Sequence, residues 1–203
     1  GSWVSEGNLQ TRVESNKGRG RLGRGWKSGL PLDAEGVGRS GYAMTIQDLP
    51  YRIDVAAASQ AVSPMIRRTP VLRAHDLESP GGNPVVLKLE NLQITGSFKV
   101  RGAANRILAL SDDERARGVV ACSSGNHGKA VAHVAGILGI SATVFVPSWV
   151  DPDKLSGMHR AGARVVLAGD TYDEAEAEAW SVAEAEGRVF VQPFDDPWAI
   201  AGQ

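Results

Sequence analysis

The 203-residue sequence contains a single cysteine, Cys122, which excludes a disulfide within the chain. No apolar run approaches the ~20 residues that a membrane-spanning helix requires, and no secretory signal stands at the beginning. The formal net charge is only −1, so neither nucleic acid nor an anionic membrane is expected as a partner. Together these absences favour a cytoplasmic protein that binds neither nucleic acid nor a membrane.

The first 43 residues lack both helical and alternating apolar periodicity. They are rich in Gly, Ser and Arg, as in GRGRLGRG at residues 18–25. Such a segment cannot bury enough apolar surface to offset the entropy lost on ordering. A basic arm for nucleic acid and a transit peptide are the alternatives, and the acidic residues count against the second. We expect a disordered or artefactual extension over residues 1–43, with Met44 as a candidate natural start.

From residue 44 onward, apolar segments of strand length alternate with segments of helical periodicity. Strands are expected at 84–90, 118–124, 142–147, 163–169 and 188–193, and helices at 46–62, 97–110, 126–140, 151–162 and 171–187. The short Gly-containing links predict right-handed crossovers and a parallel sheet. Strands that are apolar throughout predict helices on both faces. The expected fold class is therefore α/β, a parallel-sheet three-layer αβα arrangement.

Several side chains have structural roles as their first interpretation. Ser97 and Thr171 are expected to cap the helices that they precede, and Asp195 and Asp196 a helix near residue 197. Cys122 is expected to be a small buried residue at a strand end. The acidic residues of 172–186 are expected to form a solvated helix face.

The stretch ACSSGNHGKA at residues 121–130 places small residues between a buried strand and a helix. Parallel sheets bind ligands outside the carboxyl ends of their strands. The first turn of the helix presents free backbone N–H groups and the positive end of the helix dipole. Polar side chains add hydrogen-bonding groups, namely Ser123, Ser124 and Asn126. The pattern indicates a site for a carboxylate or phosphate, with helix capping alone as the alternative.

The stretch TGSFKVRGAAN at residues 95–105 places Lys99 at a helix start behind small residues. A solvated surface lysine is the simplest interpretation. A lysine that forms a Schiff base must be partly unprotonated, although its ordinary pKa is ~10.4. Burial or a nearby cation lowers that pKa. Arg101 lies two residues further on and points elsewhere on a helix, so we expect burial rather than Arg101 to activate the amine.

These two stretches resemble a known family. LKLENLQITGSFKVRGAAN and SSGNHGKAVA are similar to the pyridoxal-phosphate enzymes of the tryptophan-synthase-β-like fold, also called fold type II. Within that fold the sequence most resembles the threonine and serine dehydratases and the related serine racemases. The agreement continues in RTPVLRAHDL, in VFVPSWVDPDKLSGMHRAGARVVLAGDTYDEA and in FVQPFDDPWAIAGQ, so that it extends from about residue 53 to the last.

The resemblance implies a lyase that deaminates L-threonine or L-serine to a 2-oxo acid and ammonia by β-elimination. Lys99 would hold pyridoxal 5'-phosphate as a Schiff base and act as the base at the substrate Cα. Phe98 would pack beside the cofactor. The substrate carboxylate would be bound by a turn of five residues, Ser123, Ser124, Gly125, Asn126 and His127. Asn126 would also hydrogen-bond the phenolic oxygen of the cofactor, and Ser124 matches the base that racemases use on the opposite face.

Other branches of the fold remain alternatives. The sulfhydrylase branch typically has Val-Lys-Asp-Arg and Ser-Gly-Asn-Thr-Gly, where this sequence has FKVR at 98–101 and a turn ending in His127. Both differences favour the dehydratase branch. Lys129 and Gln192 depart from the dehydratase pattern and leave the preferred substrate open. A serine racemase, a cysteine-synthase-like enzyme and a non-catalytic remnant acting as a binding module are the other interpretations.

The resemblance also implies a domain division. Residues 44–117 would form the N-terminal part of the large cofactor domain, 118–195 a small αβα domain, and 196–203 the start of a return to the large domain. The Gly-rich phosphate loop and the cation ligands would follow Gln203. No metal site is expected within the chain, because His75, His133 and His159 lack ligand spacing with Cys, Asp or Glu. We expect a truncated fold with exposed sheet edges that aggregates or folds partially, little activity alone, and a homo-oligomeric full-length protein.

Overall fold

The computed structural model describes residues 53–79, 81–150 and 152–203, all within the unit Met44–Gln203. The extension expected at residues 1–43 and the beginning of the helix expected at 46–62 lie outside the described residues. The helices are α1 (Val55–Val62), α2 (Lys99–Leu108), α3 (Asp112–Arg117), α4 (Asn126–Leu138), α5 (Pro152–Arg160), α6 (Tyr172–Ala185) and α7 (Pro197–Gly202). The strands are β1 (Val71–Glu78), β2 (Pro84–Lys88), β3 (Val119–Cys122), β4 (Ala142–Val146), β5 (Arg164–Leu167) and β6 (Val189–Phe190), and short 3-10 helices lie at Ser63–Met65 and Glu90–Leu92.

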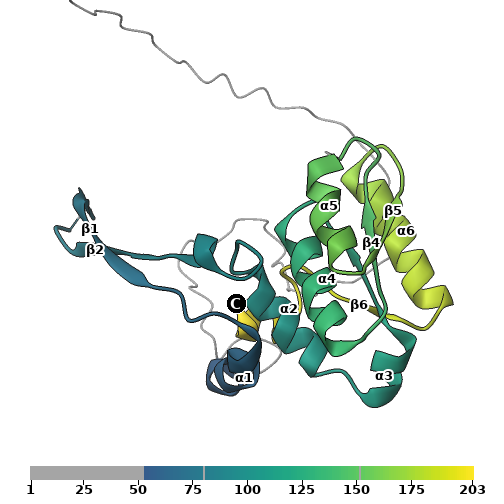
Figure 1. Ribbon diagram of the computed structural model, residues 1–203, viewed down its shortest axis with the longest axis horizontal. Coiled ribbons are helices and arrows are strands. Elements are labelled where there is room, and N and C mark those ends of the chain that lie inside the picture. Colours follow the sequence, from purple (N-terminus) through teal and green to yellow (C-terminus); the bar gives the residue numbers. More distant parts are fainter. Residues whose placement is uncertain (1–52, 80, 151) are drawn as a thin grey trace, which may run out of the picture. The chain divides into compact units, whose positions relative to one another are not determined.

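A four-stranded parallel sheet in the order β5-β4-β3-β6 forms the centre of the fold (Figure 1). Strand β3 pairs with β4 on one side and with β6 on the other, so that Val119 lies opposite both Ala142 and Val189. Strand β4 pairs in parallel with β5. The predicted parallel α/β sheet is confirmed.

Helices cover both faces of this sheet because the residues of β3 alternate between two hydrophobic clusters. Val119 and Ala121 pack with the buried residues of α4, whereas Val120 and Cys122 pack with those of α6. All four side chains of β3 are buried. A strand with apolar residues on both faces requires a layer on each side, and the predicted αβα arrangement is thereby confirmed.

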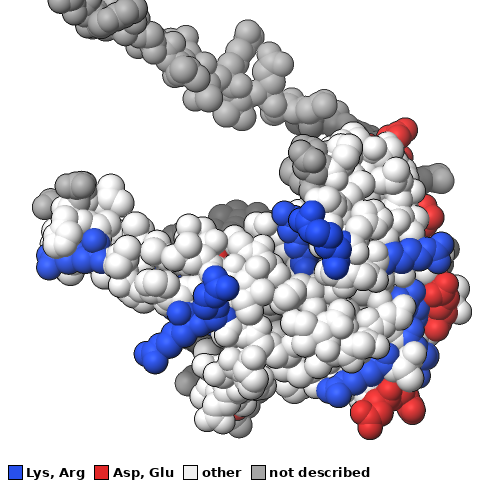
Figure 2. Space-filling view, in the orientation of Figure 1, with Lys and Arg blue, Asp and Glu red and all other residues white. Residues whose placement is uncertain are grey.

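Helix α6 packs through small residues and turns its acidic residues outward. Ala175, Ala179 and Ala183, spaced four apart on one helix face, are buried. Glu178 and Glu184 are exposed, and Figure 2 shows acidic side chains along the edge of the molecule where α6 and α3 lie. The prediction of a solvated acidic face is confirmed.

The direction in which successive strands are added to the sheet reverses next to β3. From β3 the chain passes through α4 to β4 and through α5 to β5, moving toward one edge of the sheet. Helix α6 then leads to β6 on the opposite side of β3. Such a reversal leaves a crevice at the carboxyl ends of the two strands, where doubly wound sheets bind ligands. The residues that leave these ends are Ser123 after β3 and Val191 after β6.

The first expected strand differs from its prediction. It is β2, which pairs antiparallel with β1 and is mostly exposed, so the prediction of a buried strand at 84–90 is wrong. Val86, for example, is 60% exposed. Within the described residues β2 pairs with β1 alone, and four of its five residues are exposed. Strand β1 itself was not predicted.

The caps divide into confirmed and mistaken predictions. Thr171 caps α6 and Asp196 caps α7, each through a side-chain oxygen that accepts from a backbone N–H, as predicted. Ser97 does not cap α2, because the helix begins at Lys99 and its N-cap is Phe98. Helix α3 was missed, although Ser111 and the acidic residue three positions later form a capping box.

Candidate active site

Lys99 is the first residue of α2, and the buried face of that helix fixes its position. Val100, Ala104 and Ile107 are fully buried and belong to the cluster that includes the apolar face of α4. The helix is thereby held rigidly by its apolar stripe. The backbone of Lys99, the first residue of the helix, is therefore fixed, and its long side chain extends from that position.

The amine of Lys99 is turned toward the protein. Its Nζ donates to the Pro193 carbonyl oxygen at 2.6 Å and to Gln203 Oε1 at 2.9 Å. It lies 5.2 Å from the centre of the Phe98 ring. Burial lowers the pKa of Lys99, which is the cause that the sequence led us to expect.

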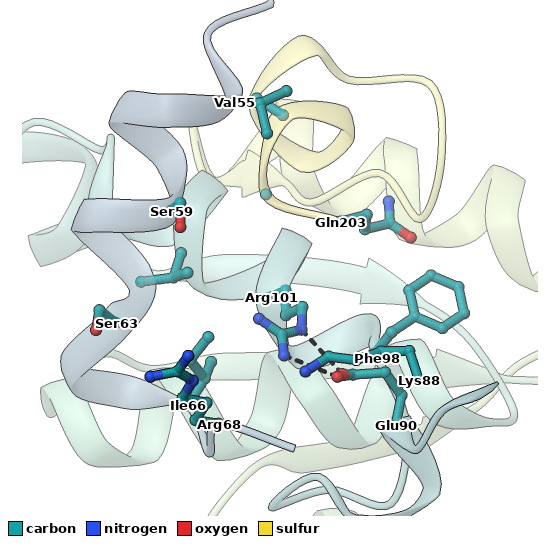
Figure 3. A pocket seen from close by; sticks show the side chains of 13 residues that line it. Val55, Ser59, Ser63, Ile66, Arg68, Lys88, Glu90, Phe98, Arg101 and Gln203 are labelled. Carbon is teal, nitrogen blue, oxygen red and sulfur yellow. Dashed lines mark hydrogen bonds and ion pairs between the residues drawn. The ribbon is translucent and has the colours of Figure 1, made fainter. Parts of the chain in front are cut away.

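Arg101 takes no part in these contacts, as its place on the helix predicts. Its guanidinium binds Glu90 through two hydrogen bonds, of 2.9 and 2.7 Å (Figure 3). The Thr69 hydroxyl donates to the same carboxylate at 2.6 Å. The hydrogen bonds from Arg101 hold the pKa of Glu90 at about 2, against the opposing effect of burial. This pair joins the segment that follows β2 to the start of α2.

Replacing Glu90 by glutamine is expected to lower the free energy of unfolding at pH 7 by about 2 kcal/mol, the magnitude of a hydrogen bond to a charged group. The folded-state pKa of about 2 lies below the ordinary value of 4.5. The contribution of Glu90 is therefore complete above pH 4.5 and is lost as the pH falls toward 2. Chemical denaturation over this range should show a smaller loss of stability for Glu90→Gln than for the unaltered chain.

The control for this prediction is Glu178→Gln on the exposed face of α6, which should change stability by less than about 0.5 kcal/mol. Equal acid sensitivity of the Glu90 variant and the unaltered chain would contradict the role given to Glu90.

The turn between β3 and α4 leads into the helix at the expected residue, whereas the strand ends two residues before the end of the expected segment 118–124. The strand ends at Cys122, and α4 begins at Asn126 with Gly125 as its N-cap and no side-chain cap. Ser123 Oγ accepts from the Gly125 N–H at 3.2 Å, and the Asn126 side chain is exposed. Uncapped N–H groups at the start of a 13-residue helix can bind an anion.

Gly128 brings α4 into direct contact with the end of β3. A Cβ atom added at Gly128 would lie 2.7 Å from the Ser123 carbonyl oxygen, 2.8 Å from Met158 Cε and 3.1 Å from a methyl group of Val144. No larger residue fits without movement of the backbone. Glycine at this position thus sets how closely the turn approaches the sheet.

His127 is buried, and its ring points toward the end of β6. Its Nε2 lies 2.9 Å from the Val191 carbonyl oxygen; a carbonyl only accepts, so Nε2 carries the hydrogen. Burial, with a smaller contribution from the charge of Lys99, lowers the pKa of His127 to about 4, against the opposing effect of the bond to Val191. The ring is therefore neutral at pH 7, and its bond to Val191 leaves the backbone N–H as the group for the substrate carboxylate in the predicted role.

The segment at 191–193 joins the two predicted stretches. The Val191 carbonyl accepts from His127 on α4, and the Pro193 carbonyl accepts from Lys99 on α2. The sequence did not identify these acceptors, because a backbone carbonyl leaves no signal in the residue type.

Two further side chains complete the description of the strand end. The Tyr172 hydroxyl donates to the Cys122 carbonyl oxygen at 3.4 Å, a contact that the sequence did not suggest. Cys122 is buried and unpaired, and burial raises the pKa of its thiol to about 12. The thiol is thus protonated at pH 7, which confirms the structural interpretation of Cys122.

A cavity of about 530 Å³ lies beside α2 (Figure 3). Phe98, Arg101 and Gln203 line it. Among the described residues, no group of three His, Cys, Asp or Glu side chains could hold a metal ion. In the same ranges no helix combines the length and the apolar character needed to cross a bilayer.

The geometry defines a class of protein before any comparison. A doubly wound sheet carries, at its point of reversal, a helix N-terminus and a lysine of lowered pKa that meet at the segment 191–193. The helix N-terminus suits an anion, and an unprotonated lysine amine suits a carbonyl carbon. The combination suits the binding of an anionic ligand that also carries a carbonyl group.

The family model described as "Pyridoxal-phosphate dependent enzyme" matches residues 62–203, and the chain belongs to this family. The L-threonine ammonia-lyase of Thermotoga maritima is 45% identical over 150 residues, which cover 74% of this chain and 37% of that protein. The solved threonine deaminase isoform 2 of Solanum lycopersicum matches with a TM-score of 0.68 and 33% identity, over 73% of this chain and 41% of that one. Maize serine racemase matches with a TM-score of 0.68 and 32% identity, over 73% and 45%.

The chain therefore spans less than half the length of each of these three proteins. The predicted tryptophan-synthase-β-like fold is confirmed for the part that the chain covers. The cofactor of the family is pyridoxal phosphate, as the resemblance implied.

The residues present fit the aldehyde end of this cofactor. Lys99 offers an amine whose pKa is lowered by burial. The Phe98 ring lies next to it, is 43% exposed and lines the cavity. The Thr95 hydroxyl is buried without a hydrogen-bond partner in the described part of the chain, which leaves a polar atom unsatisfied four residues before the lysine. Lys99 would hold the cofactor covalently, with Phe98 beside it.

Proposed function

We propose that the protein containing this chain is a pyridoxal-phosphate-dependent lyase that converts L-threonine or L-serine into a 2-oxo acid and ammonia. The observation that carries the proposal is the Lys99 amine, held at the reversal point of the sheet with a pKa lowered by burial. Similarity to the L-threonine ammonia-lyase of Thermotoga maritima supports this choice of reaction.

Lys99 would act as the base. When bound, pyridoxal phosphate supplies an electron sink for the electron pair left at the substrate Cα. The Lys99 Nζ accepts the Cα proton, and its lowered pKa keeps a larger fraction of the amine neutral near pH 7. The Phe98 ring, whose centre lies 5.2 Å from the amine, would pack on one side of it, and the exposed Asn126 amide would hydrogen-bond the cofactor.

The turn before α4 would hold the substrate carboxylate. Backbone N–H groups and the positive end of the helix dipole favour an anion at this place. The residues assigned to it are Ser123, Ser124, Gly125, Asn126 and His127. Holding the carboxylate on one side of the sheet reversal would direct the Cα proton toward Lys99.

We also propose the domain division that the resemblance implies. The four-stranded sheet lies entirely within the small domain proposed at 118–195, and α2 with Lys99 lies in the part of the large domain at 44–117. Residues 196–203 contain α7, which packs on α2 and would begin the return to the large domain. A cytoplasmic location and a homo-oligomeric state complete the proposal.

Serine racemization is the second candidate. The Ser124 hydroxyl is half-buried and makes no hydrogen bond to any other described residue, so it is available to carry a proton on the face opposite Lys99. Maize serine racemase is among the similar structures. Formation of D-serine from L-serine would support this activity, and its loss in Ser124→Ala with retained deamination would assign it to that hydroxyl.

The lyase proposal is tested with the product of the complete reading frame. The protein is incubated with pyridoxal phosphate, reduced with borohydride and digested, and the labelled peptide is identified by mass spectrometry. Label on Lys99 and release of ammonia from L-threonine are expected. Label on a different lysine would end the assignment of Lys99, and label on Lys99 without ammonia release would favour another reaction of the same family.

A further inference from the structure

Gln203 contacts the amine of Lys99 from the end of α7. Its Oε1 accepts from Lys99 Nζ at 2.9 Å, and its Nε2 lies 3.3 Å from the Ala199 carbonyl oxygen and 3.5 Å from that of Pro193. Both carbonyls can only accept, so the NH₂ group must face them. The amide oxygen is thereby directed at the lysine. Figure 3 shows the Gln203 side chain in the cavity that Phe98 also lines.

Two glycines allow α7 to pack closely on α2, and this packing fixes the position of the Gln203 backbone. A Cβ atom added at Gly102 would lie 2.7 Å from both the Ala199 carbonyl oxygen and Gln203 Cγ. One added at Gly202 would lie 2.6 Å from the Arg101 carbonyl oxygen. The backbones of the two helices thus touch within two or three residues of Lys99. The Gln203 amide is placed by this packing as well as by its own hydrogen bonds.

The two oxygens that face Lys99 match the hydrogens of a neutral amine. Such an amine has two N–H groups and one lone pair, and the Pro193 and Gln203 oxygens lie within hydrogen-bond distance of its nitrogen. If each oxygen accepts a hydrogen bond from one N–H group, the lone pair of the nitrogen points away from both oxygens. Neutral amide and carbonyl oxygens favour the charged amine less than a carboxylate would, and burial favours the neutral form.

We propose that Gln203 is a positioning residue for Lys99, which holds the free amine together with the Pro193 carbonyl and orients its lone pair for proton transfer. This inference rests on the proposed function. Once the substrate amine had replaced Lys99 on the cofactor, Lys99 would be a free amine with two N–H groups. The Pro193 and Gln203 oxygens would each accept a hydrogen bond from one of these groups, which would leave the lone pair to accept the Cα proton.

The test measures the pKa of Lys99 in the cofactor-free protein, where activity plays no part. Reductive methylation with formaldehyde and cyanoborohydride over a range of pH, followed by peptide mass spectrometry, reports the neutral fraction of each lysine. Gln203→Glu keeps the size of the side chain and places a charge near the amine, so the pKa of Lys99 should rise by about 1 unit or more. Gln203→Ala removes one acceptor and should lower that pKa. Lys129 in the same digest is the internal reference.

The matched control is Gln192→Ala in the segment 191–193, since Gln192 makes no hydrogen bond with Lys99. It should leave the pKa of Lys99 unchanged. Equal pKa values in the unaltered protein and both Gln203 variants would overturn the inference, as would a shift of the same size in Gln192→Ala. Pyridoxal-phosphate label on a lysine other than Lys99 would overturn the proposed function itself, whatever the shifts. Label on Lys99 without any shift would overturn only the role of Gln203.

Discussion

Lys99→Ala is expected to abolish the borohydride-stable attachment of pyridoxal phosphate and to reduce deamination of L-threonine by about 10³-fold or more. The first effect follows because alanine has no amine to bond the aldehyde carbon. The second follows because a positioned proton-transfer group contributes about 10²–10⁴-fold, and the same side chain would also hold the cofactor. Mass spectrometry of the reduced protein and a continuous assay of ammonia release measure the two effects.

A second variant separates the chemistry of the amine from its charge. Lys99→Arg keeps a cation that can donate to Pro193 and Gln203, but guanidinium stays protonated with a pKa above about 12. It should retain the stability of the unaltered protein better than alanine and be equally inactive. The control is Lys129→Ala, which removes a lysine from α4 and leaves α2 unchanged. This variant should still be labelled at Lys99. Stoichiometric label in Lys99→Ala would show that another residue holds the cofactor.

Gly128→Ala is expected to lower the free energy of unfolding by about 3 kcal/mol, at the upper end of the range for overpacked sites. The added methyl group would meet the Ser123 carbonyl oxygen at 2.7 Å and Met158 Cε at 2.8 Å. The methionine can move, but the carbonyl belongs to the backbone at the end of β3. Relief of the contact requires α4 to shift away from the sheet, which would displace the turn at 123–127 as well. Urea denaturation measures the loss of stability.

The control is Gly125→Ala in the same turn. A Cβ atom there has nothing within 4 Å, in contrast to the close contacts at Gly128. Its effect on stability should stay within about 0.5 kcal/mol, even if ligand binding changes. A loss as small for Gly128→Ala would mean that α4 adjusts freely and that this glycine does not set the spacing.

The parallel sheet could be predicted because its strands are unbroken apolar runs between short glycine links. Residues 142–146 are all buried, so the apolar sequence of β4 correctly indicates that the strand is buried. The strand β2 is also apolar, yet its side chains are exposed. Apolar character shows that a segment is suited to burial, whereas the covering partner comes from elsewhere. The strand could be predicted, but its burial could not.

The candidate site shows the same division between local and distant information. Lys99 and the turn before α4 stand out because each is a short motif with its own chemistry. Pro193 and Gln203 lie about a hundred positions from Lys99 in the sequence. Pro193 contacts the amine through its backbone carbonyl and Gln203 through its side chain. A contact of this kind depends on how α7 returns to α2, which hydrophobic periodicity does not encode. The misplaced cap at Ser97 has a local cause, since the helix begins one residue later than the serine suggests.

Strand β3 divides its four side chains evenly between two cores, with Val119 and Ala121 on one side and Val120 and Cys122 on the other. Inserting or deleting one residue there would exchange the two sets, because strand side chains alternate. Lengthening or shortening this strand would thus damage both cores at once, while exchanging side chains in the adjoining turn would disturb neither. Evolution can adjust what this turn binds by substitution, but has little freedom to do so by changing its distance from the sheet.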